Sequence, residues 1–212
     1  MKLGTALILT TFVILSACSS KEYIPHEGDL LFEVSENSVM SEAITESTAQ
    51  HDSIKYDHVA IFVLCDGIPS VLEASTAHGV AQTSWADFVR SSNHINGKPG
   101  LVVMRINQKA MRISQAVTRA KTYLGEPYDW SYLPDNGKMY CSELVYDAFL
   151  DADGKPLFTA KAMNFRNAKG EMPAFWTELF QKLGEPIPEG VLGTNPNEMA
   201  KDSILTEVFR YF

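Results

Sequence analysis

The stretch YDHVAIFVLCDGIPSVLEA, residues 56–74, decides the fold of this chain. It holds two apolar, β-branched runs around an Asp-Gly pair at 66–67, which is a strong signal for a β-hairpin with a two-residue turn. Such a turn pairs residues whose numbers add to 133, as 66 and 67 do, so Ala60 faces Glu73. His58 is then the diagonal neighbour of Glu73 on the same face, at about 7–8 Å between backbones. A four-residue loop keeps this parity, whereas a three-residue loop inverts it.

A second stretch, YCSELVYDAF at 140–149, predicts a helix that begins at Cys141. Helical spacing puts Leu144, Val145 and Ala148 on the same face as Cys141, so the thiol points toward the apolar interior. The positive end of the helix dipole favours a thiolate at this position. A lone cysteine is more often a small buried hydrophobe. A role as nucleophile therefore requires a base nearby.

The base that the sequence offers is His58. It begins a rigid apolar strand, whereas the other four histidines lie in polar or tether-like stretches. The alternative is a structural role, in which His58 only caps the end of the strand. Glu73 is an unusual acid in an apolar strand and needs a partner there. Together Cys141, His58 and Glu73 match the logic of a nucleophile, a base and a residue that orients the base.

The remaining elements mix helices and strands without strict βαβ alternation, which predicts an α+β fold. Helices are expected at 39–48, from 84, at 108–124, 141–150 and 173–183, and from 195, with further strands at 28–34, 101–106 and 205–212.

Five short motifs occur in a characteristic order along the chain. They are GDL (28–30), YDHVA (56–60), VLEA (71–74), LGEPYD (124–129) and YCSELV (140–145). This set, followed by GTNPN (193–197), resembles the circularly permuted NlpC/P60-type, papain-like cysteine hydrolases of the YiiX/YaeF group. In ordinary members the cysteine precedes the histidine, whereas in the permuted group the histidine strand comes first. His58 precedes Cys141 here, and the resemblance extends over about residues 28–200.

The resemblance implies a permuted papain-like fold, with a mostly antiparallel sheet packed with helices. It implies Cys141 as nucleophile and His58 as general base, with Glu73 at the place of the third polar residue. The backbone N–H of Cys141 is then the expected oxyanion donor. The hydroxyl of Tyr56 or Tyr128 is a candidate second donor to the oxyanion. The alternative for each tyrosine is a packing role.

The first seventeen residues are predicted to be a lipoprotein signal peptide. Lys2 is followed by an apolar run at 7–15 that is short for a bilayer span and typical of a secretory signal. The run ends in LSAC (15–18), which resembles a lipobox, so Cys18 is the expected lipidation site. The alternative is an ordinary signal peptide with an incidental cysteine. Ser19, in place of Asp, favours sorting to the outer membrane, facing the periplasm.

Processing at this site predicts a lipidated tether at 18–27 and a hydrolase domain at 28–212. The formal charge becomes 17 minus 26, or −9, because only Lys2 is lost. An acidic domain argues against a nucleic-acid partner, and the lipid anchor is the expected membrane contact. Two remaining cysteines and no CxxC pair exclude the usual structural zinc site.

The predicted function is an amide hydrolase of the cell envelope that works without a cofactor. The substrate is either a peptidoglycan stem peptide, which unpermuted relatives cut, or a lipid-like amide or ester. A catalytically inactive binding lipoprotein of the same fold is the main alternative, and a metal site of Asp29, His58 and Glu73 is a weaker one. Several aromatic residues are candidates for lining an apolar cleft or for the core: Trp85, Phe88, Trp130, Tyr132, Phe175 and Trp176.

Overall fold

The structure is a computed structural model that describes residues 23–49, 51–107 and 112–212. The predicted signal peptide and the predicted lipidation site Cys18 lie outside these residues. Within them, no helix is long and apolar enough to cross a membrane.

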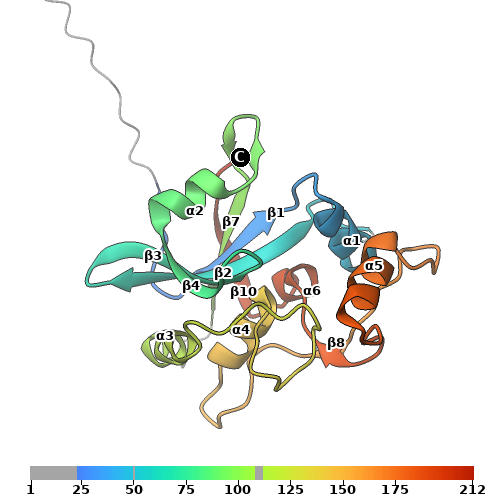
Figure 1. Ribbon diagram of the computed structural model, residues 1–212. Helices are drawn as coiled ribbons and strands as arrows, with labels where there is room; N and C mark the ends of the chain where they lie inside the picture. Colours follow the sequence, from blue (N-terminus) through green and yellow to red (C-terminus); the bar gives the residue numbers. More distant parts are fainter. Residues whose placement is uncertain (1–22, 50, 108–111) are drawn as a thin grey trace, which may run out of the picture.

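A six-stranded sheet forms the centre of the fold (Figure 1). All the strand pairs in it are antiparallel. This is the mostly antiparallel α+β arrangement that the sequence predicted. In spatial order the strands are β10 (Leu205–Arg210), β7 (Leu101–Ile106), β1 (Leu30–Val34), β2 (Tyr56–Cys65), β3 (Ile68–Ser75) and β4 (Gly79–Ser84).

The β2–β3 hairpin has the predicted register. Cys65 pairs with Ile68 and Ile61 with Leu72, so a two-residue turn closes the hairpin. The turn residues at 66–67 have φ of 51° and 78°, the left-handed conformation that an Asp-Gly turn adopts readily. Glu73 is therefore one step along the diagonal from His58, as predicted.

Local capping signals fix where three helices start. Ser38, Ser84 and Asn195 each accept a hydrogen bond from a backbone N–H three residues on, as N-cap residues do. The helices are α1 (Val39–Thr48), α2 (Trp85–Ser91), α3 (Ile113–Thr122), α4 (Cys141–Ala148), α5 (Ala174–Leu183) and α6 (Pro196–Ala200).

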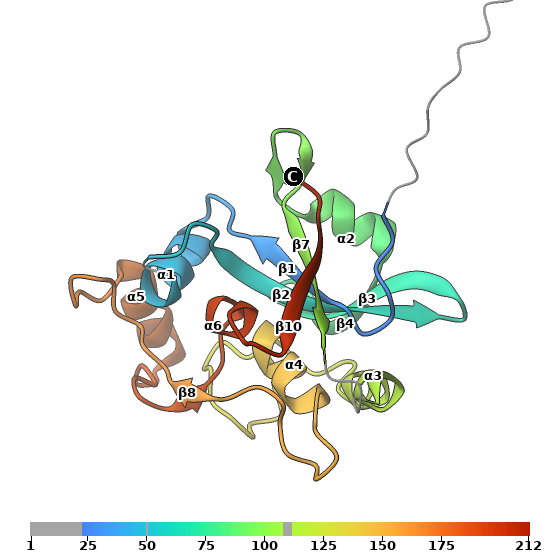
Figure 2. The same ribbon diagram turned by 180° about the vertical axis from the view of Figure 1, so that it is seen from behind.

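The helices lie on both faces and at one end of the sheet. Figures 1 and 2 show α3, α4 and α6 on one face, α2 on the other, and α1 beside α5 at one end. The first face and its helices enclose the largest apolar cluster, with Ile61, Leu72 and Leu144 fully buried. The opposite face packs under α2 around Phe62 and Trp85. Burial of both faces accounts for the long apolar runs of β2 and β3.

A third cluster joins α1 and α5 to the segment after α3. Its buried members are mostly aromatic and make edge-to-face contacts, for example Tyr132 with Trp176 at 5.6 Å between ring centroids. This aromatic cluster lies outside the main core and forms part of the site described below.

The structure differs from the sequence prediction in several elements. Strand β4 was not predicted, nor were the short pairs β5 (His94–Ile95) with β6 (Lys98–Pro99) and β8 (Lys161–Ala162) with β9 (Leu192–Gly193). The helix predicted at 108–124 is shorter, since α3 begins at Ile113; residues 108–111 lie outside the described part. The predicted strand 205–212 stops at Arg210 because its partner β7 begins at Leu101.

Candidate active site

Helix α4 positions the thiol of Cys141. Cys141 is the first residue of α4, is only 7% exposed and packs in the main core. The first N–H groups of a helix have no intrahelical acceptor, so they are free to stabilise negative charge at this end. Burial raises the pKa of Glu143, two residues on, to about 8, so this carboxyl is largely neutral near pH 7. It therefore adds little negative charge beside the thiol.

A β-bulge positions His58 on β2. Glu33 of β1 pairs with His58, but the next residue, Val34, pairs with Tyr56, so Asp57 is an extra residue in β2. Bulges turn the strand locally and re-aim its side chains, often next to active sites. The bulge thus lets a residue at the end of an apolar strand reach the start of α4.

The structure brings the three predicted residues into one hydrogen-bonded chain. His58 Nε2 lies 2.9 Å from Glu73 Oε2, and the Cys141 thiol is close enough to the same imidazole to raise its pKa. Because Glu73 occupies Nε2, Nδ1 is the ring nitrogen left for the thiol. Thr83 of β4 donates its hydroxyl to the other oxygen of Glu73 at 2.9 Å, which fixes the carboxylate.

The contacts of this chain shift the pKa of both the base and its acid. Burial disfavours the charged form of His58, but the hydrogen bonds and charges of Cys141 and Glu73 outweigh it and raise the pKa well above 6.5. Burial also acts against the Glu73 carboxylate, yet the hydrogen bond and charge of His58 and the Thr83 hydroxyl lower its pKa below 4.5. The arrangement stabilises an imidazolium between a thiol and a carboxylate.

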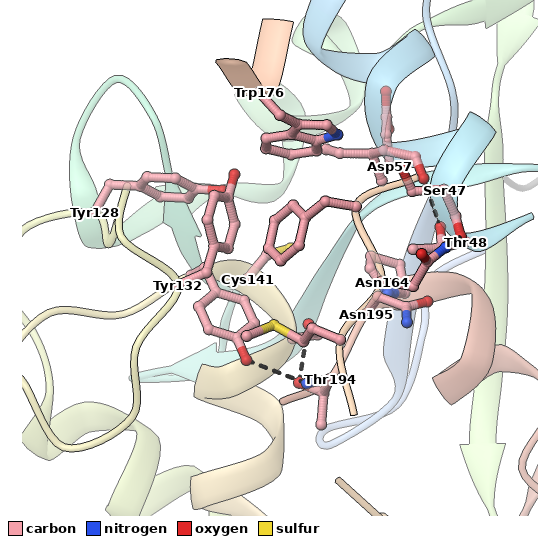
Figure 3. A pocket seen from close by; sticks show the side chains of 16 residues that line it. Ser47, Thr48, Asp57, Tyr128, Tyr132, Cys141, Asn164, Trp176, Thr194 and Asn195 are labelled. Carbon is pink, nitrogen blue, oxygen red and sulfur yellow. Dashed lines mark hydrogen bonds between the residues drawn. The ribbon is translucent and has the colours of Figure 1, made fainter. Parts of the chain in front are cut away.

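An apolar pocket opens beside Cys141 (Figure 3). It has an empty volume of about 550 Å³, including the part open to solvent. The aromatic cluster supplies its large apolar side chains, and none of its lining residues is Lys, Arg or His. The large apolar and aromatic lining residues are Ile44, Tyr128, Tyr132, Tyr140, Met163, Phe165 and Trp176.

A polar cleft lies on the His58 side of the site. It shares Ile44, Asp57 and Tyr128 with the apolar pocket, so the two hollows adjoin, with Cys141 lining the first and His58 the second. Glu33, Glu36 and Asp57 line it, and no Lys or Arg does. The site therefore has an apolar side next to the thiol and an acidic side next to the imidazole.

A comparison with known protein families matches residues 24–209 to the "Permuted papain-like amidase enzyme, YaeF/YiiX, C92 family". The match covers nearly all of the described chain. The chain belongs to this family. The predicted permuted papain-like fold is thereby confirmed.

Two relatives of the YaeF/YiiX family are similar over most of their length. The uncharacterized protein YiiX of Escherichia coli K12 is 27% identical over 185 residues, which cover 86% of this chain and 83% of YiiX. The crystal structure of YiiX from Escherichia coli O157:H7, described as a metalloprotein, has a TM-score of 0.70 and 26% identity. It covers 89% of this chain and 98% of its own.

The alternative metal site does not assemble in this YaeF/YiiX member. Both carboxylate oxygens of Asp29 bind the guanidinium of Arg105, at 2.6 and 2.7 Å, and not His58 or Glu73. Across the described ranges, no group of three or more His, Cys, Asp or Glu side chains is placed to hold a metal ion. The residues present therefore do not fit a metal at this site.

The candidate aromatic residues divide between the pocket and the core. Tyr132 and Trp176 line the pocket, whereas Trp130 and Phe175 pack in the aromatic cluster behind it. For Trp85 and Phe88 the core alternative holds, because both lie on α2 and pack against the other face of the sheet.

Of the two tyrosines considered as oxyanion donors, only one lines the site. Tyr128 lines both hollows, so its hydroxyl remains a candidate for the oxyanion site. Tyr56 lies in the main core and lines neither of them. Burial raises the pKa of Tyr128 well above its ordinary value, so its hydroxyl is a neutral donor.

Sequence reasoning missed Thr83, which holds Glu73 in place. Its strand, GVAQTS, begins with glycine and is short and polar, so it carries no clear strand signal. Glu73 pairs with Ala81 in the β3–β4 register, which puts Thr83 on the diagonal. A predicted β3–β4 hairpin would have found it.

Proposed function

We propose that this chain is a cysteine amidase of the cell envelope, with Cys141 as nucleophile, His58 as base and Glu73 as the residue that orients His58. The observation that carries the proposal is the imidazole of His58, hydrogen-bonded to Glu73 and interacting with the thiol of Cys141, which lines an apolar pocket. Membership of an amidase family supports the same chemistry.

The reaction follows from the positions of these groups. The Cys141 thiol passes its proton to His58, and the sulfur attacks the carbonyl carbon of the amide. The backbone N–H at the start of α4 stabilises the oxyanion. His58 then donates the proton to the leaving nitrogen as the C–N bond breaks. Water attacks the thioester, His58 accepts its proton, and the acid and the free thiol are released.

The two sides of the site assign the two halves of the substrate. The acyl group stays on the sulfur, so it occupies the apolar pocket that Cys141 lines. The leaving amine must accept a proton from His58, so it occupies the acidic cleft that His58 lines. Glu33, Glu36 and Asp57 favour a neutral or cationic amine there.

The pocket favours a lipid-like acyl group over a peptidoglycan stem peptide. Stem peptides carry several carboxylates, and burying a carboxylate without a cationic partner is costly. Neither hollow has a Lys or Arg side chain in its lining. A lipid-like amide or ester therefore fits this site better.

The location is proposed from the sequence alone. A lipid on Cys18 would attach the enzyme to a membrane of the envelope, and Ser19 favours the outer membrane. Substrates with an apolar acyl group are concentrated at such a surface, which agrees with the pocket.

The proposal is tested with N-acyl amides and peptidoglycan fragments as substrates. Wild-type protein should release the amine from acyl amides, and Cys141→Ala should abolish this while still binding them. Hydrolysis that survives in Cys141→Ala would overturn the assignment. Binding without turnover by the wild type would favour the inactive binding lipoprotein.

Alkylation tests the nucleophile without any substrate. Iodoacetamide should modify Cys141 near neutral pH faster than it modifies Cys65, whose thiol instead hydrogen-bonds Gln82 at 2.8 Å. His58→Ala should slow the modification of Cys141 and leave that of Cys65 unchanged. Equal rates at both cysteines would contradict an activated thiol.

A further inference from the structure

The apolar pocket contains a buried hydrogen-bond donor that the protein itself does not satisfy. Trp176 of α5 is 3% exposed and lines the pocket beside Cys141. Its indole Nε1–H has no hydrogen-bond acceptor among the residues that the structure describes. In Figure 3 the indole lies on the side of the pocket across from Thr194.

The Ser and Thr hydroxyls around the pocket are paired within the protein. Ser47 and Thr48 donate to backbone carbonyls of α1 at 2.9 and 2.7 Å, and Thr194 donates to Ser142 at 3.0 Å. Leaving a buried N–H without an acceptor costs about 1–3 kcal/mol. The Ser and Thr hydroxyls of the lining are therefore used, whereas two of its buried polar atoms have no partner among the described residues: the Nε1–H of Trp176 and the hydroxyl of Tyr132.

The nearest neighbours of the indole are aromatic rings, and the hydroxyl of the one tyrosine among them, Tyr132, does not accept its N–H. Tyr132, Phe165 and Phe175 surround it edge-to-face, with centroids 5.6, 5.1 and 4.9 Å away. An aromatic face is only a weak acceptor. A ligand in the pocket is therefore the available source of a strong one.

We infer that the indole N–H of Trp176 donates a hydrogen bond to an oxygen carried along the acyl chain of the substrate. The enzyme then selects acyl groups with a ketone, hydroxyl or ester oxygen within the chain over plain alkyl groups. This inference rests on the proposed function, because it requires the acyl group to occupy the pocket. A site with a fixed buried donor discriminates strongly between partners that have the acceptor and those that lack it.

Trp85 provides a matched control elsewhere in the fold. Its Nε1–H is also buried without an acceptor among the described residues. It packs between Phe62 and Phe88 on the opposite face of the sheet and does not line the pocket. Replacing either indole by phenylalanine removes the N–H and keeps an aromatic ring.

The test measures binding in the Cys141→Ala background, so that it does not depend on turnover. The probes are octanoyl amides of one amine, either unsubstituted or with a ketone at successive positions along the chain. At least one ketone should tighten binding about tenfold, the value of one well-made hydrogen bond to a buried donor. Trp176→Phe should remove this preference, and Trp85→Phe should retain it.

Two results would overturn the inference. One is equal binding of all the probes, or no binding at all, in Cys141→Ala. The other is a ketone preference that persists in Trp176→Phe. Failure of the proposed function is seen separately, as intact probes after incubation with the wild-type enzyme.

Discussion

At the scale of single residues, the site depends on one imidazole between two acids. Glu73 binds the ring of His58 at Nε2, and the Cys141 thiol interacts with the same ring. The side chains of His58 and Glu73 are 17% and 12% exposed, so solvent screens their interaction only weakly. Their hydrogen bond and charges move the two pKa values apart against the effect of burial, so we expect the pair to contribute to stability.

Replacing Glu73 by Gln should lower the free energy of unfolding in a pH-dependent way. The contribution of the Glu73 carboxylate is complete above its ordinary pKa of 4.5 and is lost as pH falls through the lowered value. The contribution of His58 is complete below 6.5 and is lost as pH rises through its raised value. Between pH 4.5 and 6.5 the loss should therefore be greatest, about 1.5–3 kcal/mol for a hydrogen bond between charged groups.

Urea unfolding at a series of pH values measures this difference. The control is Asp87→Asn, since Asp87 forms an exposed ion pair with Arg90 on α2. Its effect should be small and should shrink with added salt. A loss in Glu73→Gln that does not change with pH would show that the pair is not ionised as described.

At the scale of elements, edge strand β4 ties the sheet to the segment that enters the pocket. Val80 donates its N–H to the carbonyl of Glu126 at 2.8 Å and accepts from Gly125 at 2.9 Å. Tyr128 follows directly and lines both hollows. The same strand carries Thr83, so β4 supports both the acid of the site and one wall of the pocket.

Gly79→Ala should disrupt this junction. Gly79 has φ of +63°, and a Cβ there would lie 2.2 Å from the carbonyl oxygen of Glu126, which is backbone and cannot move aside easily. We expect a loss of more than about 3 kcal/mol in the free energy of unfolding, the range of overpacking together with a strained φ. Thermal or urea unfolding measures it.

Gly67→Ala separates backbone strain from the clash. Gly67 also has a positive φ, +78°, but nothing lies within 4 Å of an added Cβ. Its replacement should cost only about 1–2 kcal/mol, the penalty for the left-handed conformation. Equal losses in the two variants would mean that the contact with Glu126 has no effect of its own.

At the scale of the whole molecule, the site joins parts of the chain that are far apart. His58 lies on β2 and Cys141 begins α4, so 83 positions separate the base from the nucleophile. Helices α1 and α5, which pack beside each other at one end of the sheet, add Ile44 and Trp176 to the pocket. The proposed catalytic residues therefore depend on packing of the sheet against α4, and the proposed substrate pocket depends on the aromatic cluster as well.

Cys18→Ser tests the predicted attachment of the molecule to a membrane. A lipidated chain should sediment with membranes and carry an acyl-modified N-terminal peptide in mass spectrometry, whereas Cys18→Ser should remain in the soluble fraction. Both proteins should hydrolyse the same dissolved amide at similar rates, since Cys18 precedes the domain. Membrane association that is unchanged in Cys18→Ser would contradict the lipobox assignment.

Much of this architecture was predictable because its signals are local. The Asp-Gly turn sets the register of β2 with β3, and capping side chains mark the starts of α1, α2 and α6. The diagonal between His58 and Glu73 follows from that register alone. These features depend on residues within a few positions of one another, and the chemistry of a turn or a cap is the same in any fold.

The tertiary structure alone decided the rest. The polar edge strand β4 is a strand because β3 pairs with it, so Thr83 had no sequence signal as a partner of Glu73. Which aromatic residues line the pocket was also undecided, since Trp85 and Trp176 look alike in the sequence but pack on different sides of the fold. Spacing along the chain predicts which residues share one face of a helix or strand. A pocket, in contrast, forms from the faces that several elements leave uncovered when they pack.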